Sequence, residues 1–401
     1  MKKTLAAVAV LGAFAGSALA ADVTLYGRVD AGLNYTNVNY DGDKKDTDDF
    51  SMKSGQYTGS RWGLKGSEQI SENLTVGFQL ENGFSIDDGK LGQGDRIFGR
   101  EARVYAKTQF GEFGFGRMGG LDSGLGSYDM IGDSSPWGTG WGDYTGAMDA
   151  VFVGKSDRYD NMISYKSPTF AGLTVVAQAS LKKDSGDDGV EGKHTADRYY
   201  ALGVSGEYGA FTGAVTYSMQ DYAGLKDRMT GGVPGTAVTE DMINDDDGYA
   251  VTAWAAYDFG VTKVSLGAQY FDNVVQSRGS YKSAWNGEDN VYEYEELSFG
   301  NTGYGVILGA VTPLAGGNLY TSVGYADYET SITDPSDTTD TAEDSVELWN
   351  VSIGYDYPLS KRTKLYTAVS YTQETENTEE SGASDVDTKY TEVMAGMVHY
   401  F

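Results

Sequence analysis

The sequence contains no cysteine and only two histidines, His194 and His399. Without cysteine, the chain can form neither disulfide bonds nor thiolate metal sites. It carries 30 lysines and arginines against 58 aspartates and glutamates, a formal net charge of −28. It therefore lacks the strongly basic surface that nucleic-acid binding requires. These shortages exclude a disulfide-stapled scaffold and argue against nucleic acid as a partner.

Long apolar runs occur only at the start of the chain. Residues 1–20 combine Lys2 and Lys3, an apolar run from Leu5 to about Ala15 and a small-residue ending at Ala20, which is the pattern of a cleavable secretory signal peptide. We expect a mature chain of residues 21–401 with a charge of −30, because the balance of 30 − 58 becomes 28 − 58. No later run approaches the roughly 18 apolar residues of a transmembrane helix, so the sequence excludes a helical membrane protein.

The mature chain is rich in alternating segments instead. In VTLYGRVDAGLNY (23–35), apolar residues such as Leu25 and Val29 share one face, and polar residues such as Arg28 and Asp30 share the other. Such alternation predicts a strand that lies between an apolar and a polar medium. With 55 glycines, 30 tyrosines and six prolines, the composition favours an all-β protein.

The alternation repeats to the end of the chain. We count sixteen such segments, joined by seven short turns and eight long loops, an arrangement typical of closed antiparallel barrels in outer membranes. The sequence therefore predicts an all-β fold: a 16-stranded antiparallel transmembrane β-barrel over residues 21–401 with long extracellular loops. Lipid would solvate the outer face, and a wide aqueous lumen would lie inside.

A secreted β-sandwich or β-solenoid would also show alternating strands. A sandwich core, however, needs bulkier inward residues and usually has fewer strands in a domain. Aromatic residues recur near the ends of the predicted strands, as in the interfacial girdles of membrane barrels; examples are Trp62, Phe110, Tyr257, Phe259 and Tyr400. Their placement favours the membrane barrel.

One long segment, residues 119–157, has neither strand nor helix periodicity. Irregular segments of this length are uncommon in compact folds unless they are functional. The segment is acidic, and arginines Arg117 and Arg158 stand in the strands on either side of it. We predict that it folds inward against a basic wall of the barrel.

Several stretches resemble the trimeric general porins of Gram-negative outer membranes. They are LYGRVDAGLNY (25–35), SRWGLKGSEQISENLTVGFQLENGF (60–84), FGREARVYAKTQFGEFGFGRMGG (98–120), DRYDNMISYKSPTFAG (157–172), YDYPLSKRTKLYTAVSY (355–371) and the terminal VMAGMVHYF. The resemblance covers nearly all of the mature chain and implies a homotrimer of 16-stranded barrels in the outer membrane. It also implies that the third loop narrows each lumen, with acidic residues facing an arginine cluster on the wall.

Candidate constriction residues follow from that resemblance. On the loop they are Asp122, Asp129, Asp133 and Asp143; on the wall they are Arg28, Arg61, Lys65, Arg103, Lys107, Arg117 and Arg158. The wall residues have the polar parity of their strands except Arg117, which shares the parity of Phe113 and Phe115. We keep Arg117 because a bulge at Gly114 or Gly116 would reverse its parity, and we leave out Arg100, which has the same conflict. The loop has SSPWGTGW in place of the enteric porins' proline-glutamate-phenylalanine-glycine signature.

These features predict a water-filled channel for the passive diffusion of ions and small hydrophilic solutes. Opposed charges at the constriction order the water between them and disfavour apolar solutes. The overall charge of −30 gives a weak expectation of cation preference. We expect no cofactor and no catalytic metal, although acidic loop stretches such as 244–248 and 287–296 suit Ca²⁺ or Mg²⁺ bridges to lipopolysaccharide.

Three other functions stay open at this point. A substrate-selective channel would need an ordered ladder of lumenal aromatics, and a surface adhesin or phage receptor could use the acidic loops. An outer-membrane enzyme would need a histidine in a triad-like setting, which neither His194 nor His399 offers. The terminal Phe401 resembles the signal that the outer-membrane insertion machinery reads in this family.

Overall fold

The computed structural model describes residues 23–41, 45–186, 189–223, 247–275, 284–285, 292–293, 297–333, 341–378 and 385–401. The predicted signal peptide and most of the acidic loop stretches lie outside these ranges. Within them, no helix is long and apolar enough to cross a membrane.

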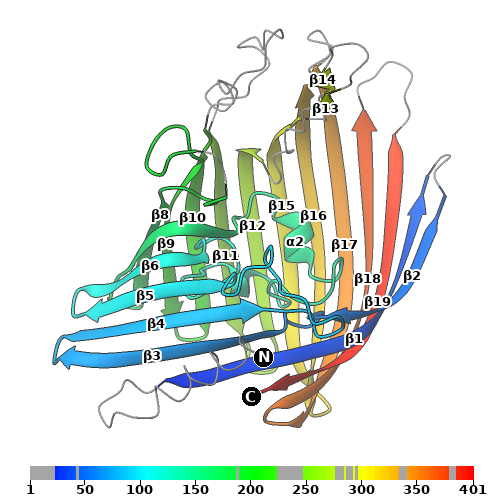
Figure 1. The fold of residues 1–401 in the computed structure, drawn as a ribbon. Coiled ribbons are helices and arrows are strands. Elements are labelled where there is room, and N and C mark those ends of the chain that lie inside the picture. The colour runs from blue at the N-terminus through cyan, green and yellow to red at the C-terminus, as the bar shows by residue number, and fades with distance from the viewer. Residues whose placement is uncertain are drawn as a thin grey trace, which may run out of the picture.

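Most of the described chain is strand (Figure 1). The first strands are β1 (Thr24–Tyr40), β2 (Thr47–Ser54), β3 (Arg61–Ser71), β4 (Leu74–Gly83), β5 (Glu101–Thr108), β6 (Gly111–Gly119), β7 (Arg158–Lys166), β8 (Leu173–Ser180), β9 (Arg198–Tyr208) and β10 (Phe211–Asp221). They are followed by β11 (Gly248–Asp258), β12 (Lys263–Val274), β13 (Ala284–Trp285), β14 (Tyr292–Glu293), β15 (Leu297–Leu314), β16 (Gly317–Thr333), β17 (Thr341–Ser360), β18 (Thr363–Thr378) and β19 (Val386–Tyr400).

The sheet closes on itself. Successive strands of the wall pair antiparallel, with β12 pairing with β15. β19 pairs with β1 from Arg28 opposite Tyr400 to Tyr40 opposite Thr388. β2 and β3 both pair with β1 and together fill one place in the barrel wall, while β13 and β14 form a separate two-stranded sheet. The wall therefore has sixteen places, and the predicted 16-stranded antiparallel barrel is confirmed. Closure leaves no unpaired sheet edge.

The region of β1 to β3 differs from the sequence prediction. The charged stretch NYDGDKKDTDDF (39–50) has the composition of a loop, but β1 continues to Tyr40 and β2 already begins at Thr47. The ladder is interrupted later, at residues 55–60, where Gly55 has a φ of +73°. Charged residues here extend the hairpin above the apolar band, where either face of a strand can meet water.

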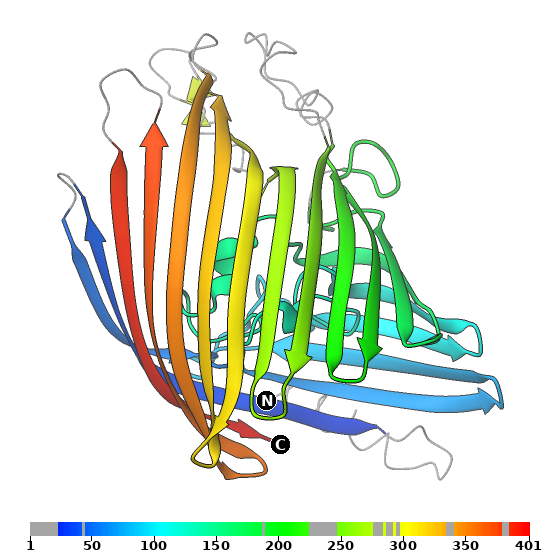
Figure 2. The same cartoon turned by 180° about the vertical axis from the view of Figure 1, so that it is seen from behind.

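The two faces of the wall differ as alternation predicts. On β17, Trp349, Val351 and Ile353 are exposed on the outside, while Asn350 and Ser352 are buried on the inside. The wall also varies in height: β5 to β8 have eight or nine residues each, whereas β15 to β19 have 15 to 20. Figures 1 and 2 show the long strands from yellow to red on one side of the barrel.

The segment between β6 and β7 lies inside the barrel (Figure 1). It contains a 3₁₀ turn, η1 (Gly132–Ser134), and one short helix, α2 (Ala147–Val151). Buried residues Ile131, Phe152 and Val151 pack against the inner face of the long strands, including Ile307 of β15. Glycine permits this contact, because a Cβ on Gly305 would collide with the backbone oxygen of Val151. We call residues 120–157 the constriction loop.

Candidate functional site

The base of the constriction loop is fixed by Asp122. This residue is fully buried, and its carboxylate accepts hydrogen bonds from the hydroxyls of Ser156, Tyr199 and Ser218. Two of these donors belong to β9 and β10, and Ser156 belongs to the returning end of the loop. The prediction that Asp122 faces the arginines across the lumen is therefore wrong: its polarity holds the two ends of the loop to the wall.

The far turn of the loop is fixed by Glu392 on β19. Its buried carboxylate accepts hydrogen bonds from the backbone N–H groups of Asp143, Tyr144 and Thr145 at 3.2, 3.0 and 3.0 Å, and from the Thr145 hydroxyl at 2.9 Å. The backbone oxygen of Gln56 accepts the N–H groups of Trp141 and Gly142 beside this turn. The base and the far turn of the loop are thus each fixed to the barrel through a buried carboxylate.

Aromatic rings hold the loop between these two ends. Trp137 and Trp141 are buried and contact each other edge to face at 5.1 Å. The indole N–H of Trp137 donates to the Ser322 hydroxyl at 2.6 Å, and Trp141 packs on Tyr57 and Tyr320. Aromatic contacts therefore hold the SSPWGTGW segment against the long-strand wall, because buried aromatic pairs attract each other beyond the free energy of their burial.

The opposite wall carries an arginine cluster, which we define as Arg28, Arg61, Arg100 and Arg158. Arg28 and Arg61 both donate to the Thr58 hydroxyl, at 3.1 and 3.2 Å. Arg61 and Arg100 share the carboxylate of Glu81, at 3.6 and 2.7 Å. Arg158 lies within electrostatic reach of Arg100 and Glu81. Arg158 also lies 3.9 Å from Asp157 of the loop. Three strands and the residue before β5 thus bring four guanidinium groups close together, and Glu81 is paired with two of them.

Arg100 corrects the sequence prediction that left it out. It stands just before β5, where strand alternation does not yet apply, and it is 8% exposed beside Glu81. Glu81 was visible in the sequence as a polar residue on the inner parity of its strand. A buried carboxylate needs a charged or hydrogen-bonding partner. Glu81 was therefore the feature of the sequence that could have indicated an arginine beside it.

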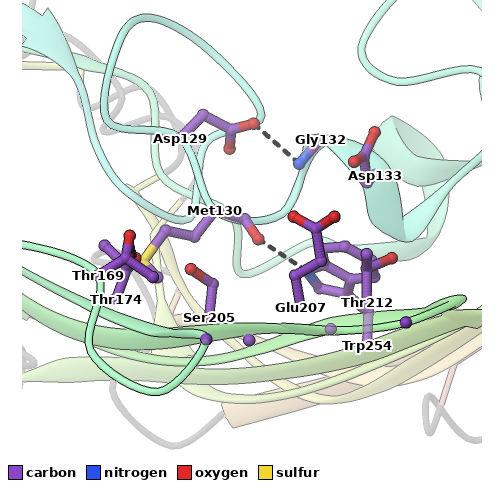
Figure 3. Close-up of a pocket in the computed structure, with 14 residues that line it drawn as sticks. Asp129, Met130, Gly132, Asp133, Thr169, Thr174, Ser205, Glu207, Thr212 and Trp254 are labelled. Carbon is purple, nitrogen blue, oxygen red and sulfur yellow. Dashed lines mark hydrogen bonds between the residues drawn. The ribbon is translucent and has the colours of Figure 1, made fainter.

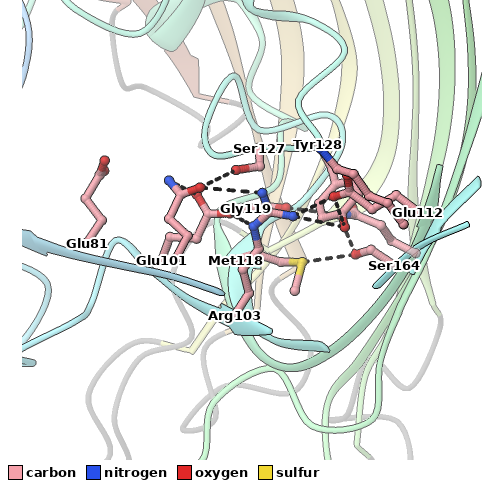
Figure 4. A network of polar contacts seen from close by, with 12 residues as sticks. Glu81, Glu101, Arg103, Glu112, Met118, Gly119, Ser127, Tyr128 and Ser164 are labelled. Carbon is pink, nitrogen blue, oxygen red and sulfur yellow. Dashed lines mark hydrogen bonds and ion pairs between the residues drawn. The ribbon is translucent and has the colours of Figure 1, made fainter. Parts of the chain in front are cut away.

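Arg103 and Lys107 occupy a second, balanced network on β5 and β6 (Figure 4). Arg103 pairs with Glu101 at 2.8 Å and with Glu112 at 2.7 Å, and Lys107 lies 3.2 Å from Glu112. The hydroxyl of Tyr128, a loop residue, donates to Glu112 at 2.8 Å. Two carboxylates therefore match these two cations, and the network joins the loop to the wall.

Arg117 is placed by a bulge. The register between β6 and β7 shifts between Gly116 and Met118, and Gly116 has a φ of +132°, which favours glycine. This is one of the two bulge positions that the sequence suggested. Arg117 then donates to Asp160 at 2.7 Å and to the Gly99 carbonyl at 2.8 Å. Its charge is therefore paired beside the arginine cluster and not within it.

Asp129 and Asp133 line a cavity beneath the loop (Figure 3). The cavity, about 740 Å³ in volume, lies between the loop and β8 to β11, and Glu207 and Trp254 also line it. The Asp129 carboxylate accepts the N–H groups of Ile131 and Gly132 at 3.0 and 2.9 Å, and burial raises the pKa of Asp129 to about 6. Asp133 is exposed and lies 3.9 Å from Lys263.

The two remaining predicted lumenal residues lie at different places. Asp143 forms an ion pair with Lys53 of β2, and Lys65 is exposed, with its ammonium 5.2 Å from the centre of the Tyr26 ring. The structure thus brings Arg28, Arg61 and Arg158 together with Arg100. Among the described residues, none of the four loop aspartates forms an ion pair with that arginine cluster.

Comparisons with known proteins agree with this architecture. A family model described as Gram-negative porin matches residues 6–378. An outer membrane porin protein of Bordetella pertussis is 29% identical, with both chains covered completely. Outer membrane porin protein 32 of Delftia acidovorans is 28% identical over 92% of this chain and 89% of its own length.

Solved structures support the same fold. An anion-selective porin from Comamonas acidovorans superposes with a TM-score of 0.64 and 22% identity. The match covers 95% of this chain and all of that one. At this identity the likeness speaks for the barrel architecture alone.

Proposed function

We propose that the arginine cluster sets the charge preference of the channel at its narrowest section. The chain belongs to the Gram-negative porin family and forms a channel for passive diffusion in the outer membrane. The proposal is supported by the closeness of the four arginines: Arg61 and Arg100 share the Glu81 carboxylate, Arg28 and Arg61 share the Thr58 hydroxyl, and Arg158 lies within electrostatic reach of Arg100. A cluster of this sign attracts anions and repels cations over a screening length of about 8 to 10 Å.

The loop aspartates oppose this cluster only in part. Asp122 is enclosed by hydroxyls, Asp143 is paired with Lys53, and Asp129 and Asp133 line the cavity on the side of β8 to β11. We infer that anions pass close to the arginine wall, while cations pass closer to Asp133 and Glu207. The weak overall cation preference expected from the net charge stays a prediction, because it depends on acidic loops outside the described residues.

Neutralising two members of the cluster tests the proposal. Arg61→Gln with Arg158→Gln is expected to raise the potassium-to-chloride permeability ratio by about threefold or more, because two charges bordering the path are removed. The measurement is the reversal potential of planar bilayers under a KCl gradient. Lys90→Gln is the control, since it removes one positive charge from an exposed loop and should leave the ratio unchanged. An unchanged reversal potential in the double variant would contradict the proposed role.

We further propose that the barrel assembles as a homotrimer, in contact with lipid, lipopolysaccharide and the outer-membrane insertion machinery. The family membership supports the trimer, and so does the apolar outer face of the short-strand wall, where Leu25, Val104 and Phe115 are exposed. We propose no catalytic activity. His399 shares a hydrogen bond of 2.9 Å with the Thr363 hydroxyl at the barrel surface, a setting that lacks a nucleophile activated for chemistry.

Phe401 is proposed as the assembly signal. Its backbone N–H and C=O both pair with Gly27 at 3.0 Å, and its ring covers that glycine. Phe401→Ser is expected to lower the yield of heat-modifiable trimer in outer membranes. The substitution weakens the contact at the seam between β1 and β19 and removes the ring that the insertion machinery would recognise. Phe401→Tyr keeps the ring and should preserve the yield. Equal yields from both variants would remove Phe401 from this role.

A further inference from the structure

Two carboxylates on β18 lie above the constriction loop without a cationic partner. Glu374 and Glu376 alternate with outward residues and share the lumenal face of Thr372 and Ser370, which are buried. Glu374 is half-buried. Among the described residues, neither carboxylate has a hydrogen bond or ion pair, and the charged neighbour acting on Glu374 is Glu376 itself. Glu376 is exposed beside the half-buried Glu374. Two like charges on one face, one of them partly removed from water, attract a cation.

Tyrosine rings from three elements surround these carboxylates. Tyr144 of the loop stacks on Tyr390 of β19, with ring centres 4.4 Å apart and planes at 18°. Tyr390 stands opposite Thr372 on the neighbouring strand β18. Thr372 precedes Glu374 by two residues and lies on the same face of that strand. Tyr144, Tyr390 and Tyr328 of β16 all lie within electrostatic reach of Glu374. The strand register agrees, since Glu376 stands opposite Val346, which stands opposite Tyr328. The rings and carboxylates therefore face the same part of the lumen.

We propose that this patch, Glu374 and Glu376 with Tyr144, Tyr328 and Tyr390, binds small organic cations of the quaternary ammonium class. Aromatic faces attract such cations through the ring quadrupole, and the interaction strengthens where water is partly excluded. A carboxylate beside the rings supplies the opposite charge. A strongly hydrated inorganic ion gains little from a ring face, so the patch selects soft, bulky cations over potassium.

The site differs in place and chemistry from the arginine cluster. It lies on the long-strand wall, on the mouth side of the loop turn that Glu392 holds, whereas the cluster lies on β1, β3 and the chain beside β5 and β7. Organic cations would thus be retained above the constriction before they cross it. Binding of an organic cation at this patch does not depend on the sign of the channel's small-ion selectivity.

Current block by phenyltrimethylammonium in planar bilayers tests the proposal. The probe, added on the side of the long loops, is expected to block the open channel reversibly. Glu374→Gln with Glu376→Gln should weaken the block by at least about fivefold, and Tyr390→Leu by about threefold. Glu347→Gln is the matched control, because Glu347 lies on the exposed outer face of β17, next to β18; its block should stay within about twofold of the parent chain.

Equal block of the parent chain and the Glu374→Gln, Glu376→Gln variant would overturn the site. Equal block by ammonium chloride at the same concentration would show that the carboxylates attract any cation and that the rings play no role. This result would also overturn the proposed site. If the double variant fails to insert, Tyr390→Leu and Tyr144→Leu decide the question. The reversal potential in KCl, recorded in the same membranes, separates this result from the test of the arginine cluster.

Discussion

Glu392→Ala is expected to release the far turn of the constriction loop and to produce strong fluctuations of the open-channel current. The substitution removes the acceptor of three backbone hydrogen bonds and one hydroxyl hydrogen bond. Hydrogen bonds to a charged group contribute about 1.5 to 3 kcal/mol each, and not additively. We expect the free energy of local opening at residues 143–145 to fall by about 3 kcal/mol or more.

Two measurements check this prediction. Amide hydrogen exchange at residues 143–145 should accelerate by about a hundredfold or more, the rate equivalent of that free energy, and single-channel noise should rise. Glu392→Gln keeps one acceptor oxygen without the charge and should give an intermediate result. Unchanged exchange in Glu392→Ala would show that the turn is held without this carboxylate, by the contacts of Trp137 and Trp141 and by the hydrogen bonds of Tyr144 and Thr145 to Asn350 and Ser370.

Asp122→Ala is expected to destabilise the base of the loop by about 3 to 5 kcal/mol, because three hydroxyls lose a buried charged acceptor. The temperature at which the protein shifts in heat-modified gel migration should fall accordingly. Asp133→Ala is the matched control, since Asp133 is exposed and 3.9 Å from Lys263, and it should cost less than about 1 kcal/mol. Equal shifts for the two variants would refute the anchoring role of Asp122.

The barrel could be predicted from the sequence because its cause is local. Alternation with a period of two records the contrast between lipid and water at each position, and no tertiary contact is needed to observe it. The bulge at Gly116 was foreseeable for the same reason, since glycine and a parity conflict at Arg117 stand next to each other. The upper part of the hairpin of β1 and β2 was missed because the charged stretch 39–50 resembles a loop in composition.

The site was predicted less well because its causes are distant in sequence. Asp122 and Asp133 are the same residue type in the same acidic loop, and the first is an anchor because it meets the distant hydroxyls of Tyr199 and Ser218. Arg100 was left out because parity was applied to a residue that precedes its strand. Glu392 could be seen as a charged residue in the last strand, but its partners are up to 249 residues away.

The anchorage by Glu392 also dictates when the pore can narrow during biogenesis. The far turn of the loop is held by Glu392 of β19, by Asn350 of β17 and Ser370 of β18, and by Gln56 between β2 and β3. Its full set of contacts therefore forms only after the first and last parts of the chain have met. Contacts of such long sequence separation form slowly. Before the barrel closes, the loop does not narrow the lumen. Closure of the seam between β1 and β19 therefore decides when the channel becomes size-selective.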